Sequence, residues 1–110
     1  MTSLKKTKDI NRVFKAGRGF KEGSFLIKFV RNDSNVSRFA FVAGLKVSKK
    51  ANQRNKIKRR IREIIKANLL VIEPGFDVVI TVLAGADGKS FQEIEEAMKK
   101  LLQKAELIRP

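Results

Sequence analysis

The sequence predicts an α+β domain with the element order α-β-β-α-β-α, arranged as a two-layer sandwich of helices on a small mixed sheet. Residues 49–66 carry isoleucines at helical spacing, which is typical of an amphipathic helix. Residues 24–31 and 38–47 alternate as strands do, and residues 76–84 are an almost unbroken apolar run. A chain of 110 residues can bury one hydrophobic core, so we expect a single domain over residues 1–110.

The composition is strongly basic, with 25 Lys and Arg against 11 Asp and Glu and a net charge of +14. This imbalance favours a polyanionic partner, either nucleic acid or an anionic membrane surface. No apolar run approaches the ~18 residues of a membrane span, and the N-terminus has no apolar segment of the signal-peptide type. We therefore expect a cytoplasmic protein with no membrane partner.

The residue types that carry most enzyme chemistry are scarce or absent. The chain has no His and no Cys, which excludes histidine base catalysis, thiol nucleophiles, disulfides and most transition-metal sites. The acidic residues form no cluster with the spacing that holds Mg²⁺ or Zn²⁺, and Asp77 is interpreted as marking the end of a strand. We expect no catalytic residue, no metal site and no small-molecule substrate in the chain itself.

The first helix is predicted over residues 7–16. Thr7 is a candidate N-cap, and Gly17 follows the last helical residue. Val13 is expected to face the core. Phe14 is apolar as well, and the pattern leaves two alternatives for it, a core position or a position in a groove.

The two runs 24–31 and 38–47 are predicted to form an antiparallel hairpin around the turn residues 32–35. One face of this hairpin, which includes Leu45, is large and aromatic and is expected in the core. The other face is small and flat and carries Lys28 and Lys46, which would suit an extended single strand of nucleic acid. An ordinary half-solvated sheet explains the hairpin equally well.

The most informative stretch is Lys49–Lys66, in which nine of 18 residues are Lys or Arg and one is acidic. We predict a helix that starts near Asn52 as N-cap and runs to about Leu70. Four isoleucines share its buried side: Ile57, Ile61, Ile64 and Ile65. The cations gather on the outer side, and because they lack acidic neighbours, a polyanion is a better explanation for them than a solvated helix surface.

The C-terminal part reads as a strand and a capped helix. Residues 76–84 are predicted to be a central strand, buried on both faces. Ser90 and Glu93 have the spacing of a capping box at the start of the last helix. The buried stripe of that helix is predicted to comprise Phe91, Ile94, Met98, Leu101 and Leu102. The strand–helix–strand passage over residues 38–84 is long enough for a parallel crossover, and the general rule makes such a crossover right-handed.

Two motifs carry a resemblance to a known family. The strand end GLKVSKK at 44–50 is followed by the helix start RNKIKRRIRE at 54–63, and the chain opens with an LK…VFKxG pattern between Leu4 and Gly17. In these motifs, and over nearly its whole length, the chain resembles the protein subunit of bacterial ribonuclease P. The resemblance implies a left-handed crossover, against the general rule. It also implies that the protein assists a catalytic RNA, ribonuclease P RNA, in removing the 5′ leader from precursor tRNA. The RNA performs hydrolysis with Mg²⁺, and the protein raises substrate and metal affinity.

The resemblance assigns roles to residues at matching positions. The candidate RNA-binding residues are Lys49, Lys50, Arg54, Asn55, Lys56, Lys58, Arg59 and Arg62. The candidate residues of a leader-binding cleft are Ile10, Phe14, Lys28, Lys46 and Ser48. Aromatic residues are common in the family where this chain has Ile10 and Lys28, and the loop between Lys50 and Arg54 is shorter than usual. We therefore expect leader binding to depend more on charge than on stacking.

Two other classes of protein fit part of the pattern. A structural RNA-binding protein, such as a ribosomal protein, would share the charge but would need no open groove. A DNA-binding module would need its basic helix free to enter a major groove, whereas the four isoleucines indicate that one side of this helix is packed.

Overall fold

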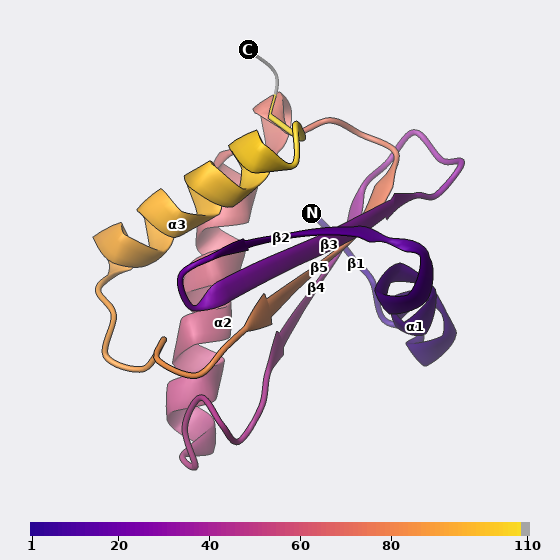
Figure 1. Cartoon of the computed structure of the whole chain (residues 1–110). Helices are drawn as coiled ribbons and strands as arrows, with labels where there is room; N and C mark the ends of the chain where they lie inside the picture. The colour runs from indigo at the N-terminus through magenta and orange to yellow at the C-terminus, as the bar shows by residue number, and fades with distance from the viewer. Residues whose placement is uncertain (109–110) are drawn as a thin grey trace.

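The computed structural model describes residues 1–108, which form a five-stranded mixed sheet with helices on both faces (Figure 1). The elements are β1 (Thr2–Ser3), α1 (Thr7–Ala16), β2 (Arg18–Glu22), β3 (Phe25–Arg31), β4 (Arg38–Ala43), α2 (Ala51–Ala67), the short 3₁₀ helix η1 (Leu69–Val71), β5 (Phe76–Val82) and α3 (Phe91–Lys104). Helices α2 and α3 cover one face of the sheet, and α1 lies on the other. The predicted α+β class is confirmed.

The strand order is β1-β4-β5-β3-β2, so the predicted hairpin between 24–31 and 38–47 is wrong. Strand β5 lies between β3 and β4, antiparallel to the first and parallel to the second. As predicted, β5 is central: Val78, Val79 and Ile80 are all buried, which satisfies a strand that is apolar on both faces. Residues 32–37 connect β3 to β4 and are long enough to cross two strand spacings of about 4.8 Å each. Strand β5 can therefore lie between these two strands.

The hairpin in the structure joins β2 to β3 instead. Strand β2 pairs with β3 from Arg18↔Phe29 to Glu22↔Phe25, and Gly23 supplies the positive φ (+56°) of the turn. Strand β2 was not predicted because Phe20 is its single large apolar side chain and it lies at the sheet edge. The two-residue strand β1, which pairs with the start of β4, was not predicted either.

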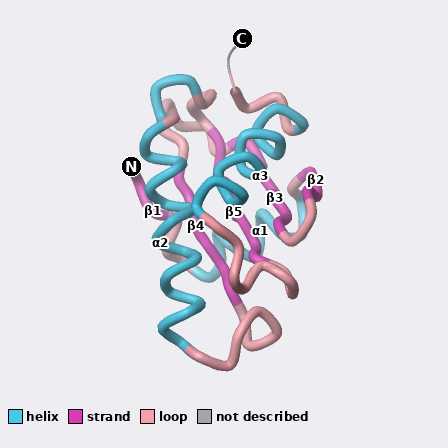
Figure 2. Tube along the Cα trace, turned by 90° about the vertical axis from the view of Figure 1, so that its left-hand side faces the viewer, coloured by secondary structure: helices cyan, strands magenta, loops and turns pink. Residues whose placement is uncertain are grey.

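The crossover from β4 through α2 to β5 is left-handed. The strands are parallel neighbours, and when they are viewed from the α2 side and point upward, β5 lies to the left of β4 (Figures 1 and 2). The general rule gives the wrong hand here, and the hand implied by the family resemblance is confirmed.

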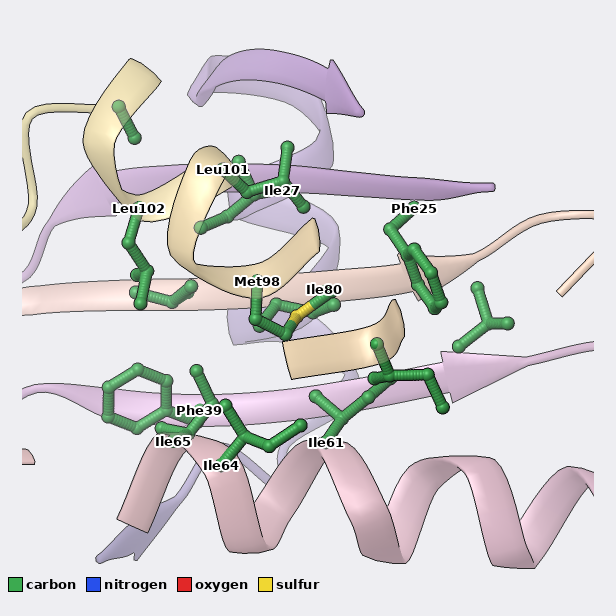
Figure 3. Close-up of a cluster of buried hydrophobic side chains, with 14 of the residues drawn as sticks. Phe25, Ile27, Phe39, Ile61, Ile64, Ile65, Ile80, Met98, Leu101 and Leu102 are labelled. Carbon is green, nitrogen blue, oxygen red and sulfur yellow. The ribbon is translucent and has the colours of Figure 1, made fainter. Parts of the chain in front are cut away.

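The main core lies between the sheet and the helices α2 and α3 (Figure 3). All four isoleucines of α2 are buried, as predicted. The α3 stripe is buried too, except for Phe91, which is 37% exposed. Phe91 is the first residue of α3, and its side chain therefore lies outside the turn that packs on the sheet. The capping box is confirmed: Ser90 Oγ accepts from Glu93 N (3.1 Å) and Glu93 Oε1 accepts from Ser90 N (3.0 Å).

The other predicted helix ends need correction. Lys6, not Thr7, is the N-cap of α1, and Lys50, not Asn52, is the N-cap of α2, and neither makes a side-chain capping bond. Helix α2 ends at Ala67, short of Leu70. Asn68 stops it, because its side-chain amide donates to Ile64 O (2.8 Å) and the chain then tightens into η1.

Candidate nucleic-acid interface

Helix α1 covers only one end of its face of the sheet. Val13 is fully buried, as predicted, in a small cluster that α1 forms with the sheet: Leu4, Val13, Ala40 and Val79, with Ile10 and Val30 packed around them. Beyond this cluster four side chains of the same face remain partly or well exposed. These residues, Leu26, Lys28, Val42 and Thr81, are called the open sheet face below.

Phe14 and Lys28 lie together at the border of this open sheet face. The Lys28 ammonium donates to the backbone carbonyl of Phe14 (3.0 Å), which places a cation at the C-terminal end of α1, where the helix dipole favours it. The Phe14 side chain is 38% exposed, which excludes the core position, the first of the two alternatives. Ile10, in contrast, is half-buried against the small cluster and contributes mainly to packing.

The far end of the open sheet face is closed by the turn after β4. Strand β4 ends at Ala43, and Val47 N donates to Gly44 O (3.1 Å), so the prediction of a strand to residue 47 is wrong. The turn also puts Leu45 in solvent, 70% exposed, where a core position was predicted. Lys46 is exposed and lines a shallow, largely apolar cavity of about 390 Å³ together with Val42 and Thr81.

The loop between β4 and α2 is held by local hydrogen bonds. Ser48 Oγ accepts from Lys50 N (3.2 Å), and Ser48 O accepts from Arg54 Nη1 (2.8 Å). One N–H of Arg54 therefore holds the loop that carries Lys49 and Lys50, and both of these lysines are exposed. The shortened loop is thereby closed onto the first turn of α2.

The outer side of α2 is a surface of unpaired cations. The cationic flank, as it is called below, consists of the exposed residues Asn55, Lys56, Arg59 and Arg62 and the half-buried Lys58. No ion pair found within residues 1–108 includes a cation of α2. Arg62 lies with its guanidinium carbon 5.5 Å from the centre of the Phe41 ring, a contact that uses none of its N–H donors.

One charged cluster was missed by sequence reasoning. Asp77 is completely buried, and its carboxylate accepts from Arg38 Nε (2.8 Å), Arg38 Nη2 (2.6 Å) and Asn32 Nδ2 (3.0 Å). Arg38 also approaches Asp9 of α1 (3.5 Å). Burial alone would raise the pKa of Asp77, but the hydrogen bonds from Arg38 and Asn32 and the charge of Arg12 together lower it. The cluster joins α1 to β4 and β5. An Asp inside an apolar strand was the indication available in the sequence.

Two further properties bear on function. The Asp and Glu residues of the described chain form no group of three that could hold a metal ion. None of the described helices combines the length and the apolar character needed to cross a membrane.

Comparison with known proteins decides the family. A family model described as Ribonuclease P matches residues 1–106. The chain belongs to the ribonuclease P protein family. A ribonuclease P protein component from Synechocystis is 34% identical over 96% of this chain and 86% of its own length, and one from Clostridium kluyveri is 34% identical over 94% of both chains.

Solved structures agree with this assignment. The ribonuclease P protein from Thermotoga maritima superposes with a TM-score of 0.85 at 30% identity, covering 94% of this chain and 97% of that one. A Staphylococcus aureus ribonuclease P protein structure has the same fold, with a TM-score of 0.91 at 24% identity over 99% of each chain. The chain is thus a protein component of ribonuclease P, an endoribonuclease that processes tRNA, and it acts within a ribonucleoprotein.

Proposed function

We propose that this chain binds ribonuclease P RNA through the cationic flank of α2 and holds the single-stranded 5′ leader of precursor tRNA on the open sheet face. The observation that carries the proposal is the incomplete cover of the sheet by α1, which leaves a flat surface with Lys28 and Phe14 at one end and Lys46 at the other. A flat surface bordered by cations and one exposed ring suits an extended strand of RNA.

The cationic flank supports the contact with the RNA subunit. Its cations have no acidic partners within residues 1–108, so they repel one another until phosphates approach. Arg59 and Arg62 can pair with phosphates through two donors at once, whereas Lys56 and Lys58 act as point charges. Four buried isoleucines fix the opposite side of α2 against the sheet, which presents the flank as a rigid surface and argues against insertion of this helix into a DNA groove.

The open sheet face supports the contact with the leader. Leu26 on β3 and Val42 on β4 both pair with Thr81 of β5, so they lie two strand spacings or about 10 Å apart, and this width accommodates a single strand. Lys28 is the one charged side chain among the four residues of the face, and Leu26 and Val42 offer apolar area to the bases. Phe14 provides one ring on which a base can stack, at a gain of about 1–3 kcal/mol.

Mg²⁺ enters this proposal through the RNA. The described acidic residues do not form a site that fits the ion, so Mg²⁺ would be held by the RNA subunit. The cations of this chain would lower the repulsion between phosphates of the two RNAs. We therefore propose that the protein reduces the Mg²⁺ concentration needed for substrate binding.

Reconstitution tests the proposal. Purified protein is added to a bacterial ribonuclease P RNA at low Mg²⁺, and cleavage is measured on precursor tRNAs with a leader of several nucleotides or of one nucleotide. We expect the protein to restore cleavage at low Mg²⁺ and to improve binding of the longer-leader substrate alone. Equal improvement for both substrates would contradict the leader site, and a structural RNA-binding protein without a groove would behave in that way.

A further inference from the structure

A second group of cations and rings lies on the opposite face of the sheet from Lys28. Along β3, side chains alternate between faces, so Phe29 and Arg31 point to the α3 side while Lys28 and Val30 point to the α1 side. Arg18 is paired with Phe29, and Phe76 is paired with Arg31, so all four side chains lie on the α3 side. They occupy the end of that face where α3 has ended.

These residues form a row of three rings with a cation at each end. Arg18 lies over the ring of Phe20 (5.7 Å), Phe20 is stacked with Phe29 (6.2 Å, 14° between planes), Phe29 meets Phe76 edge to face (5.8 Å), and Arg31 lies over Phe76 (5.0 Å). These contacts place each guanidinium carbon over a ring and use none of the N–H donors of the group. Neither Arg18 nor Arg31 forms a side-chain hydrogen bond or an ion pair with any other residue of the 1–108 segment, and both are exposed.

A cavity of about 470 Å³ lies between the two arginines. Phe29 and Phe76 form part of its wall, and the chain after α3, including Glu106, closes one side. Its volume falls within the ~300–1,000 Å³ of sites that take small organic ligands. Arg18 and Arg31 are diagonal neighbours across β2 and β3, with Cβ atoms roughly 7 Å apart, and both line the cavity, so both can contact one ligand.

We propose that this cavity, named here the arginine–phenylalanine site, binds an unpaired nucleotide of ribonuclease P RNA. The two guanidinium forks would hold the phosphates on the 5′ and 3′ sides of the nucleotide, and the base would stack between the exposed side of an arginine and the ring edges. An acidic peptide would explain the cations but not the rings, and an apolar ligand would explain the rings but not two unpaired guanidinium groups. The proposal rests on the proposed function, because it assumes that the catalytic RNA surrounds the protein.

The position of the site favours the RNA subunit over the leader as the source of the nucleotide. A leader on the open sheet face lies on the α1 side, and the sheet separates it from the arginine–phenylalanine site. The outer surface of α1 continues the positive charge toward the site, because Lys8, Arg12 and Lys15 line a shallow depression that shares Ala16 with the cavity. A second RNA segment can therefore run along the outer surface of α1 to the site while the leader occupies the open sheet face.

Substitution gives the first arm of the test. Arg18→Ala/Arg31→Ala is compared with Lys99→Ala/Lys100→Ala, which removes the same charge from the exposed side of α3. We expect the arginine pair to weaken binding of the RNA subunit roughly ten-fold and to reduce the log–log salt slope by about 1.4, since two phosphate contacts are lost. Arg18→Lys/Arg31→Lys should recover only part of the affinity, because the fork is missing. Equal effects of the two alanine pairs would overturn the proposal.

Localised cleavage gives the second arm. The chain has no cysteine, so Glu106→Cys, Asn55→Cys and Gln92→Cys each provide a single attachment point for an iron–EDTA group. With the RNA subunit and precursor tRNA labelled separately, we expect the group at 106 to cut one discrete segment of the RNA subunit, and the group at 92 to cut none. Cuts from 55 without cuts from 106, or cuts from 106 in precursor tRNA alone, overturn this inference. If the group at 106 cuts and the group at 55 does not, the proposed role of α2 is overturned instead. If neither group cuts, both proposals are overturned.

Discussion

Arg38 holds the buried carboxylate of Asp77 with two hydrogen bonds, from Nε to Oδ1 (2.8 Å) and from Nη2 to Oδ2 (2.6 Å). The pair joins the parallel strands β4 and β5 at the level where they are in register, Arg38↔Asp77. Arg38 also reaches Asp9, and Arg12 lies 3.7 Å from Asp77, so the same carboxylate anchors α1 to the sheet. The position of α1 decides how much of the sheet stays open, and this charged cluster therefore helps to define the open sheet face.

Arg38→Ala should destabilise the fold by roughly 3 kcal/mol at pH 7, because it leaves a buried carboxylate without its main partner. The lowered pKa of Asp77 means that its contribution is present above the unfolded value of about 4 and is lost as the pH falls below it. In the variant burial dominates and the pKa of Asp77 rises. The deficit relative to the wild type should therefore shrink as the pH is lowered from 7 to 4, which urea unfolding at several pH values measures.

The control for this prediction is the double variant Arg38→Ala/Asp77→Asn, which should recover part of the lost stability. A hydrogen bond from Lys104 lowers the pKa of Glu22, and the capping hydrogen bond from Ser90 N lowers the pKa of Glu93. Both carboxylates therefore also favour folding above pH 4. These two interactions are intact in all variants, so their contributions cancel in the difference between the unfolding free energies of variant and wild type. A deficit that stays constant between pH 7 and pH 4 would show that Asp77 is not the group responsible.

Ser90→Ala should cost about 1 kcal/mol of stability, because it removes the acceptor for Glu93 N at the start of α3. Ser90→Asp should retain the cap. Helix α3 carries none of the proposed RNA contacts, so both variants should bind ribonuclease P RNA with wild-type affinity at a temperature where they are folded. Thermal unfolding and filter binding measure the two effects, and a loss of RNA affinity in folded Ser90→Ala would place α3 in the interface.

The elements that were predicted correctly are those whose local pattern and tertiary environment agree. Ile57, Ile61, Ile64 and Ile65 are spaced for one helix face, and the sheet buries that face. Ser90 and Glu93 satisfy each other without help from the rest of the fold. The cationic flank was predictable for the same reason, because burial of the isoleucines leaves the remaining side of α2 to solvent or a partner.

The errors come from information that is not local. Strand pairing depends on which strand is most apolar, and β5, which is buried on both faces, takes the place beside β3 that a hairpin would have given to β4. The exposure of Leu45 follows from a turn at Gly44 that the alternating pattern hides. The arginine–phenylalanine site combines residues of β2, β3 and β5, so it can be recognised only once the register of these strands is known.

Phe14→Ala should weaken binding of precursor tRNA with a long leader by roughly ten-fold and leave a one-nucleotide leader unaffected, because a stacking surface is lost. Stability should fall by about 1 kcal/mol or less, since the ring is 38% exposed. Phe91→Ala is a matched control: that ring is 37% exposed but lies on α3. Similar effects of the two variants on leader binding would remove Phe14 from the cleft, and unfolding of Phe14→Ala would assign it to the core.

Arg62→Ala should weaken assembly with ribonuclease P RNA and reduce the log–log salt slope by about 0.7–0.9, as expected for one phosphate contact. Arg62→Lys keeps the charge but loses the fork and the stacking on Phe41, so its affinity should be intermediate. Lys99→Ala, on the exposed side of α3, should leave the slope unchanged. A salt titration of RNA binding measures all three, and an unchanged slope for Arg62→Ala would exclude the guanidinium from the RNA contact.

Sulfate should stabilise the free protein more than chloride does at the same ionic strength. The net charge of +14 opposes the compact state, and α2 concentrates cations that have no acidic partners within residues 1–108. An anion that binds the folded state alone adds about 2.7 kcal/mol when its concentration is 100 times its dissociation constant. Far-ultraviolet circular dichroism during thermal unfolding measures the gain. In Arg59→Ala/Arg62→Ala the gain from sulfate should be smaller, because two of the cations that would hold the anion are missing. If chloride at matched ionic strength is as effective as sulfate, screening rather than anion binding explains the stabilisation.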